Sequence, residues 1–114
     1  MQDCLFCKIV KKEIPAQIVS EDENILVFKD VNPQAPVHLL LIPKKHISSL
    51  LELQDDDADL AGKIQLTAAR MAKEMGLAKT GFRLVCNCGR DSGQLVFHIH
   101  YHLLAGRAMN WPPG

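Results

Sequence analysis

The sequence predicts an α+β fold, with an antiparallel five-stranded sheet, one main helix and a short N-terminal helix. Two observations carry this prediction. Five short apolar segments have the composition of strands, and one long stretch has apolar residues at the three- and four-residue steps of an amphipathic helix. The chain has 114 residues, of which 47% are hydrophobic, so it can bury a core, and we expect a single domain over residues 1–114.

The first half of the chain is expected to hold the short helix and three strands. The helix is predicted over residues 4–12, and Pro33 and Pro36 favour a loop, because each proline removes a backbone donor and restricts the residue before it. Polar residues 21–24 form a turn between the first two strands, and Pro43 stops the third. These strands are predicted over residues 18–19, 25–28 and 38–42.

The second half is expected to hold the main helix and two further strands. The helix is predicted over residues 56–75, and the acidic run 55–57 suits its positive N-terminal end better than it suits a metal site. Gly76 is expected to cap its C-terminal end. Residues 82–87 and 97–104 are the predicted strands, with a glycine-rich loop between them. The apolar face of the helix consists of Leu60, Ile64, Ala68, Met71 and Met75.

Charge and hydropathy argue against two classes of partner. Thirteen basic residues balance thirteen acidic ones, so no basic stripe marks a nucleic-acid partner. No apolar run approaches the roughly 20 residues that a membrane helix needs, so no membrane partner is expected. The N-terminus lacks the basic and apolar regions of a signal peptide. We therefore expect a cytoplasmic protein whose four cysteines are thiols or metal ligands in a reducing compartment.

Three histidines near the C-terminal end recur with period two, at His98, His100 and His102. In an extended strand such residues point to one face, while the residues between them fill the other. A neutral imidazole is a competent nucleophile toward phosphorus or acyl carbon, and a protonated neighbour can stabilise charge on phosphoryl oxygens. A metal-binding strand or partly exposed surface histidines would be the simpler interpretations. Three histidines in strict alternation favour a reaction site.

The segment His98-Ile99-His100-Tyr101-His102-Leu103-Leu104 resembles the motif of the histidine triad (HIT) superfamily, and nearly the whole chain is similar to its histidine triad nucleotide-binding (HINT) branch. The similarity includes the C-terminal Trp-Pro-Pro-Gly, which is specific to that branch. The resemblance implies a HIT-like fold and a homodimer whose sheet continues from one protomer to the other. The other matching segments are residues 6–14, 30–36, 38, 42–48 and 105–107.

The resemblance implies a purine nucleoside phosphoramidase that hydrolyses adenosine 5′-monophosphoramidates, with aminoacyl-adenylates as a further substrate class. The products are AMP and an amine, formed through a nucleotidyl-histidine on His100. His102 matches the residue that contacts the phosphate, and His38 would help to orient the histidines, although a satisfied histidine in a buried strand is nearly as good an interpretation. A dinucleoside polyphosphate hydrolase and a non-catalytic nucleotide-binding interaction module are the alternatives.

The same resemblance implies a site for an AMP-like purine nucleotide. Asp30 would accept both ribose hydroxyls, and Trp111 would reach toward the partner's active site. Leu95 departs from the pattern, because close relatives often carry a serine there that donates to the phosphate or leaving group, and leucine cannot donate. The residues expected at the base are Phe6, Ile9, Ile14, Phe28 and Val31. Those expected at the phosphate are Asn87, Gly93 and Gln94.

Catalysis is expected to need no cofactor, but a structural zinc ion is one interpretation of Cys4-Leu5-Phe6-Cys7, because a two-residue gap is common among zinc ligands. His46 and His98 could complete a Cys2His2 set, as the first triad histidine does in related superfamily members. The other interpretation is two small thiols in a short helix. A zinc ion on this set would leave His100 and His102 free.

Overall fold

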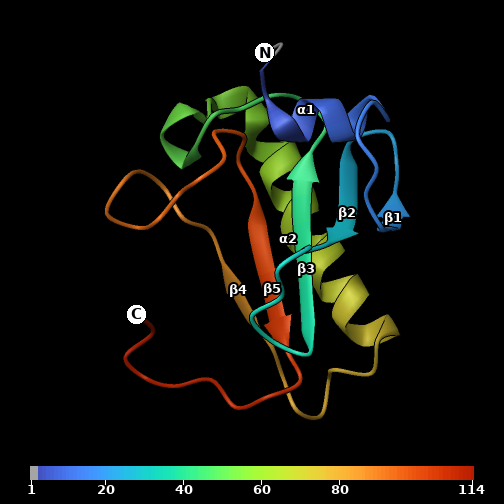
Figure 1. Cartoon of the computed structure of the whole chain (residues 1–114), viewed down its shortest axis with the longest axis vertical. Helices are drawn as coiled ribbons and strands as arrows, with labels where there is room; N and C mark the ends of the chain where they lie inside the picture. Colours follow the sequence, from blue (N-terminus) through green and yellow to red (C-terminus); the bar gives the residue numbers. More distant parts are fainter. Residues whose placement is uncertain (1–2) are drawn as a thin grey trace.

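The computed structural model describes residues 3–114 and contains one five-stranded sheet in the order β1-β2-β3-β5-β4 (Figure 1). Every neighbouring pair of strands is antiparallel, as the sequence predicted. The strands are β1 (Ile18–Glu21), β2 (Ile25–Lys29), β3 (Val37–Pro43), β4 (Arg83–Val85) and β5 (Tyr101–Ala105). The helices are α1 (Leu5–Val10) and α2 (Ala58–Glu74), with two 3-10 turns, Leu50–Glu52 and Asp55–Asp57, before α2.

Helix α2 covers one face of the sheet and lies behind it in Figure 1. Alternation along the strands supplies the apolar side chains of this face, because successive residues of a strand point to opposite sides. The layer between sheet and helix is fully apolar, and its burial from water is the main stabilising term of the fold. Its buried members are Ile25, Val27, Leu39, Leu41, Ile64, Ala68, Met71, Ala72, Leu77, Leu103 and Ala105.

Helix α1 packs on the opposite face, at the end of the strands near the N-terminus (Figure 1). Phe6 and Ile9 of α1 are buried there against the other set of alternating residues, Leu26, Phe28, Leu40 and Ile42. The rings of Phe6 and Phe28 meet edge to face, with centroids 5.5 Å apart. This face is therefore only partly covered, and it is the face that carries the histidines.

Both ends of α2 have the caps that the sequence suggested. At the start, the Asp57 carboxylate accepts the Gln54 amide at 3.0 Å and pairs with the Lys45 ammonium at 2.6 Å, which holds the pKa of Asp57 below its usual value. The acidic run therefore has a structural role. At the end, Gly76 has φ +74°, and its amide donates to the Lys73 carbonyl at 3.1 Å. A left-handed glycine with this bond is a common helix stop.

The predicted strand 97–104 is too long at its start, because β5 begins only at Tyr101. In the register of β3 and β5, the position opposite Ile99 is Pro43, which has no amide proton for the ladder. The Ile99 amide donates to the Ile47 carbonyl at 2.6 Å instead. The prediction that all three triad histidines lie in one strand is therefore wrong, and only His102 does. Strand β4 is also shorter than the predicted 82–87, since the chain leaves the sheet after Val85.

None of the helices within residues 3–114 is both long and apolar enough to cross a membrane.

Candidate active site and metal cluster

A cleft of about 430 Å³ opens between α1, β2, β3 and the segment that leads into β5. Its wall is mostly apolar, with the imidazoles of His100 and His102 and the carboxylate of Asp30 as polar members. Leu95 lies at its mouth with 88% of the side chain exposed. Eight of the residues expected to bind the nucleotide line this cleft, namely Phe6, Ile9, Ile14, Phe28, Asp30, Val31, His100 and His102. Leu5, Pro15, Ala16, Lys29, Leu40 and Val96 line it as well and were not predicted.

Four predicted nucleotide contacts do not line this cleft. Asn87 and Gly93 lie in the loop between β4 and β5, and Trp111 is 82% exposed on the C-terminal segment. Gln94 is buried, and its amide holds the loop: its Nε2 donates to the carbonyls of Ser48 at 2.8 Å and Val96 at 3.0 Å. Its Oε1 accepts the Gly89 amide at 3.0 Å. The Gln94 side chain therefore braces the loop.

The hydrogen bonds of His38 determine which nitrogen of each neutral ring carries the proton. The Gln34 amide donates to His38 Nδ1 at 3.0 Å, so the proton of His38 lies on Nε2. That Nε2 is 2.9 Å from His102 Nδ1 and therefore donates to it. The proton of His102 must then lie on its own Nε2, where it is a donor for a ligand oxygen.

The proton of His100 is placed on the opposite nitrogen. His100 Nδ1 lies 2.8 Å from the His98 carbonyl, which can only accept, so Nδ1 carries the proton and Nε2 keeps its lone pair. The ring is held edge to face against Phe6, with centroids 5.1 Å apart, and lies 5.0 Å from the His102 ring. The site thus presents one lone pair and one N–H on two adjacent imidazoles.

Burial keeps the supporting histidines neutral. It lowers the pKa of His102 to about 4, and the neighbouring rings of His100 and His38 add to this shift. Burial also lowers the pKa of His38, and the Asp30 carboxylate opposes that shift. The Asp30 Oδ2 atom lies 3.4 Å from His38 Nε2. Near pH 7 the two rings are therefore in the neutral forms that their hydrogen bonds define.

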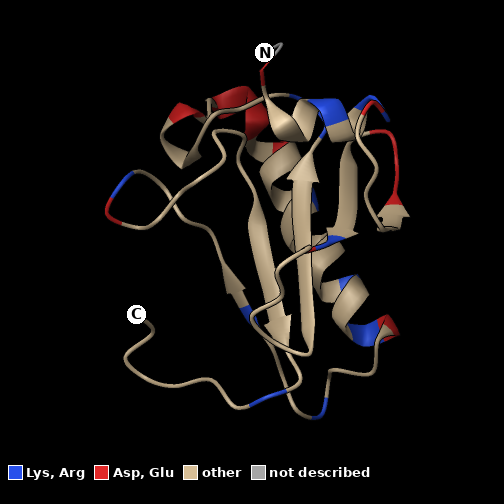
Figure 2. Cartoon of the chain, in the orientation of Figure 1, with Lys and Arg blue, Asp and Glu red and all other residues tan. Residues whose placement is uncertain are grey.

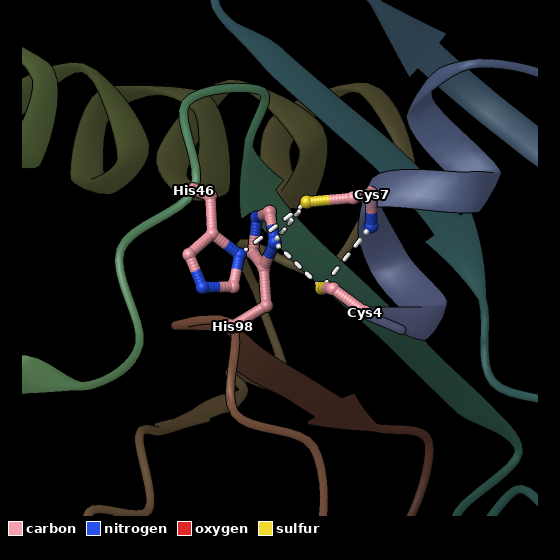
Figure 3. Close-up of side chains that lie close together, drawn as sticks. All are labelled: Cys4, Cys7, His46 and His98. Atoms are coloured by element: carbon pink, nitrogen blue, oxygen red, sulfur yellow. Dashed lines mark hydrogen bonds between the residues drawn. The ribbon is translucent and has the colours of Figure 1, made fainter. Parts of the chain in front are cut away.

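A second cluster lies beside the cleft, where Cys4, Cys7, His46 and His98 meet (Figure 3). One ligand atom from each lies within 4.8 Å of all the others. His98 Nδ1 is 3.4 Å from the sulfur of Cys4 and 3.6 Å from that of Cys7, and His46 Nδ1 is 3.3 Å from Cys7 Sγ. Ligand atoms on a tetrahedral zinc ion are about 3.5 Å apart, given the usual bond lengths.

The protonation of this cluster also suits a metal. His98 Nε2 lies 2.7 Å from the Pro43 carbonyl and so carries the proton, which leaves the lone pair of Nδ1 facing the sulfurs. Burial lowers the pKa of both His46 and His98, so both rings are neutral, as ligands must be. Burial raises the pKa of the Cys7 thiol, a shift that a bound cation would oppose. The four residues therefore fit a Cys2His2 metal site.

Comparisons with known proteins agree with this geometry. Residues 11–109 match the HIT domain. A HIT family hydrolase from Legionella pneumophila is 54% identical, with a TM-score of 0.96 over 98% of this chain and 100% of that one. A 14 kDa zinc-binding protein of Brassica juncea is 47% identical over 98% of this chain and 100% of its own length. Adenylylsulfatase HINT1 of Arabidopsis thaliana is 48% identical over 96% of this chain and 76% of its own length. The chain belongs to the HIT domain family, as its histidine motif predicted.

Proposed function

We propose that this protein is a hydrolase of adenosine 5′-monophosphoramidates that releases AMP and an amine. One observation carries the proposal: the His98 carbonyl holds the proton of His100 on Nδ1, so that the lone pair of Nε2 is available in the cleft. A neutral imidazole with a free lone pair is a nucleophile for phosphorus. The relatives named hydrolase and adenylylsulfatase support hydrolysis at such a site.

The reaction proceeds in two displacements at the α-phosphorus. His100 Nε2 attacks, the phosphorus–nitrogen bond of the substrate breaks, and the leaving nitrogen takes up one proton and departs as an amine. Water then attacks the nucleotidyl-histidine, gives up one proton and releases AMP with His100 restored. The Nε2–H of His102 donates to a phosphoryl oxygen and stabilises the charge that develops there. His38 fixes this orientation through its bond to His102 Nδ1.

The cleft selects the nucleoside by shape and by one carboxylate. Phe6, Phe28 and Ile9 offer apolar surface to a purine, which distinguishes bases mainly by size. Asp30 Oδ1 already accepts the Asn32 amide at 2.8 Å, and the carboxylate keeps further lone pairs for the two ribose hydroxyls. Aminoacyl-adenylates fit the same scheme, since only the leaving group differs.

Adenylylsulfate is the second candidate substrate. The name of the Arabidopsis relative favours it, and the attack on the α-phosphorus would be the same, with sulfate as the leaving group. A dinucleoside polyphosphate, and binding of a nucleotide without turnover, are the remaining outcomes that an assay must separate.

A zinc ion on Cys4, Cys7, His46 and His98 belongs to this proposal as a structural component. When bound, it would cross-link α1 to the sheet by metal–ligand bonds. The residues support such a role because Phe6, which walls the cleft, lies between the two cysteines. Catalysis itself is assigned to His100 and His102 and needs no metal.

The proposal also includes a homodimer. Strand β4 is an edge strand, and its outer backbone groups could pair with a second copy. Near that edge, Phe82 is 42% exposed and Leu66 of α2 is 71% exposed, and apolar surface of this kind is what a partner would cover. Analytical ultracentrifugation tests this part, and a monomer at all concentrations would remove it.

The central experiment measures hydrolysis of an adenosine 5′-phosphoramidate, with adenylylsulfate and a diadenosine polyphosphate in parallel. We expect release of AMP from the phosphoramidate and a nucleotidyl adduct on His100, detectable by mass spectrometry after rapid quenching. His100→Ala should abolish turnover while AMP still binds. Arg90→Ala is the matched control, because Arg90 lies on the exposed loop with Asp91 as its ion-pair partner. Near-normal turnover by His100→Ala would refute the mechanism.

A further inference from the structure

A second cavity, of about 470 Å³, lies on the far side of the histidines from the nucleotide cleft. It is formed by β4, β5 and the segment that follows β5. Its lining includes Arg83, Val85, Leu104, Arg107, Met109 and Asn110. The function proposed above uses none of these residues.

The register of the sheet places this cavity next to the reacting groups. Val85 of β4 is directly opposite His102, and Arg83 is opposite Leu104, which in turn is opposite His38 of β3. Residues that are directly opposite in antiparallel strands point to the same face. The side chains of Arg83 and Val85 therefore share the sheet face of His38 and His102. The apolar cleft lies over β2 and β3, the cavity lies over β4 and β5, and the histidines lie between them.

The charge of this cavity is one-sided. Figure 2 shows basic and no acidic residues along β4 and along the chain just after β5. Arg83 donates only to the Asn110 carbonyl, at 3.0 Å, and Arg107 only to the carbonyls of Gln34 and Ala108, at 3.2 Å each. No acidic group among residues 3–114 forms an ion pair with either guanidinium. Each guanidinium has five N–H groups, so most of these donors are available to a ligand.

We propose that this cavity is the leaving-group subsite and that it selects amines that carry a carboxylate, such as amino acids joined to the nucleotide through their amino group. The inference rests on the proposed function, because it identifies the part of the substrate beyond the phosphorus. A nucleotide seated with its base over β2 and its phosphate at His102 directs its remaining substituent toward β4. A guanidinium binds a carboxylate through two parallel N–H bonds, and two such groups here have no acidic partner.

The same arrangement explains the asymmetry of the whole sheet face. The nucleoside side is apolar with a single carboxylate, Asp30, which suits hydroxyls and repels anions. The opposite side holds Arg83 and Arg107 and suits an anion. A substrate with a carboxylate on its leaving group is therefore bound in one direction only. Pairing of β4 with a second copy would use backbone groups at the strand edge and leave the Arg83 side chain on the face.

The test uses adenosine 5′-phosphoramidates of a series of linear ω-amino acids, each paired with the amide of the same amino acid. For at least one chain length we expect a higher kcat/KM for the carboxylate than for its amide. Arg83→Gln and Arg107→Gln should each lower kcat/KM for that carboxylate about tenfold, as expected for charged hydrogen bonds, and leave the amide unchanged. Raising the ionic strength should reduce the preference. Arg90→Gln, which removes the same charge outside the cavity, should have no effect.

Binding separates this inference from the proposed function. Phosphonates with the same tails, in which CH2 replaces the bridging nitrogen, cannot be hydrolysed, and their dissociation constants report the subsite without turnover. If no phosphoramidate is hydrolysed but the carboxylate tail still binds more tightly in an arginine-dependent way, the subsite stands and the reaction is wrong. If turnover is normal and both arginine variants affect carboxylate and amide equally, or wild type shows no preference at any length, the subsite is refuted.

Discussion

Stability between pH 7.5 and pH 5.0 tests the buried, neutral state of His102. Burial and two neighbouring imidazoles lower its pKa in the folded protein to about 4, whereas an unfolded histidine titrates near about 6.5. Between these values the unfolded chain binds more protons than the native one, so acidification favours unfolding. The loss begins as the pH falls through about 6.5 and is complete below about 4.

The magnitude follows from the two pKa values. For pKa values of about 6.5 and about 4, lowering the pH from about 7.5 to about 5.0 removes at most about 2 kcal/mol through His102 alone. His102 is only half-buried, so solvent screening reduces this to about 1 kcal/mol. His38 titrates in the same direction, because burial lowers its pKa too. Carboxylates remain ionised over this interval and contribute little.

Urea unfolding at a series of pH values is the appropriate assay. The free energy of unfolding of the wild type should fall on acidification, and His102→Asn should fall by about 1 kcal/mol less over the same interval. His46 and His98 also titrate, and a metal on them would add its own pH dependence, but both effects are common to the two proteins and cancel in the comparison. Identical pH dependence in both proteins would show that His102 is not buried as a neutral ring, and the tautomers assigned through it would then fail.

Three further predictions address the ribose, the metal and a loop. Asp30→Ala should weaken AMP about tenfold and inorganic phosphate hardly at all in calorimetry, whereas equal losses would remove its ribose role. Purified protein should contain one zinc ion per chain; Cys7→Ser should lose it and lower the melting temperature by more than about 10 °C, while Cys88→Ser retains both, and unchanged zinc content in Cys7→Ser would contradict the cluster. Gly106→Ala should cost at least about 2 kcal/mol of unfolding free energy, because φ is +92° and a Cβ atom would lie 2.8 Å from that of Pro36. Gly62→Ala in α2, where nothing lies within 4 Å, should instead be stabilising, and similar effects of the two substitutions would refute the steric argument.

Periodicity was sufficient for the larger elements of the fold. The helix residues Ile64, Ala68 and Met71 all face the sheet, because a long amphipathic pattern is determined locally. The start of β5 was not predictable in the same way, since it depends on Pro43 standing opposite Ile99 in a register that only the assembled sheet defines. The alternation of the three histidines therefore located the site correctly in the sequence even though only the last of them lies in a strand.

The candidate site divides along the same line. The resemblance identified the cleft residues one by one, and Phe6, Asp30 and His100 do line one cavity. It also suggested a phosphate contact for Gln94, whose amide is instead committed to carbonyls, one of them 46 positions away in the sequence. No local pattern reports a partner at that distance. The pairing of His38 with His102, 64 positions apart, likewise appears only when β3 and β5 meet.

The shortness of α1 has a consequence for how long the cleft remains formed. A helix of six residues is far too short to persist in water on its own, because nucleation outweighs the few hydrogen bonds it gains. Its lifetime on the sheet is set by the apolar contacts of Phe6 and Ile9 and by whatever joins Cys4 and Cys7 to the two histidines. Because α1 is also one wall of the cleft, the rate at which its amide protons exchange with solvent measures how often the nucleotide site opens.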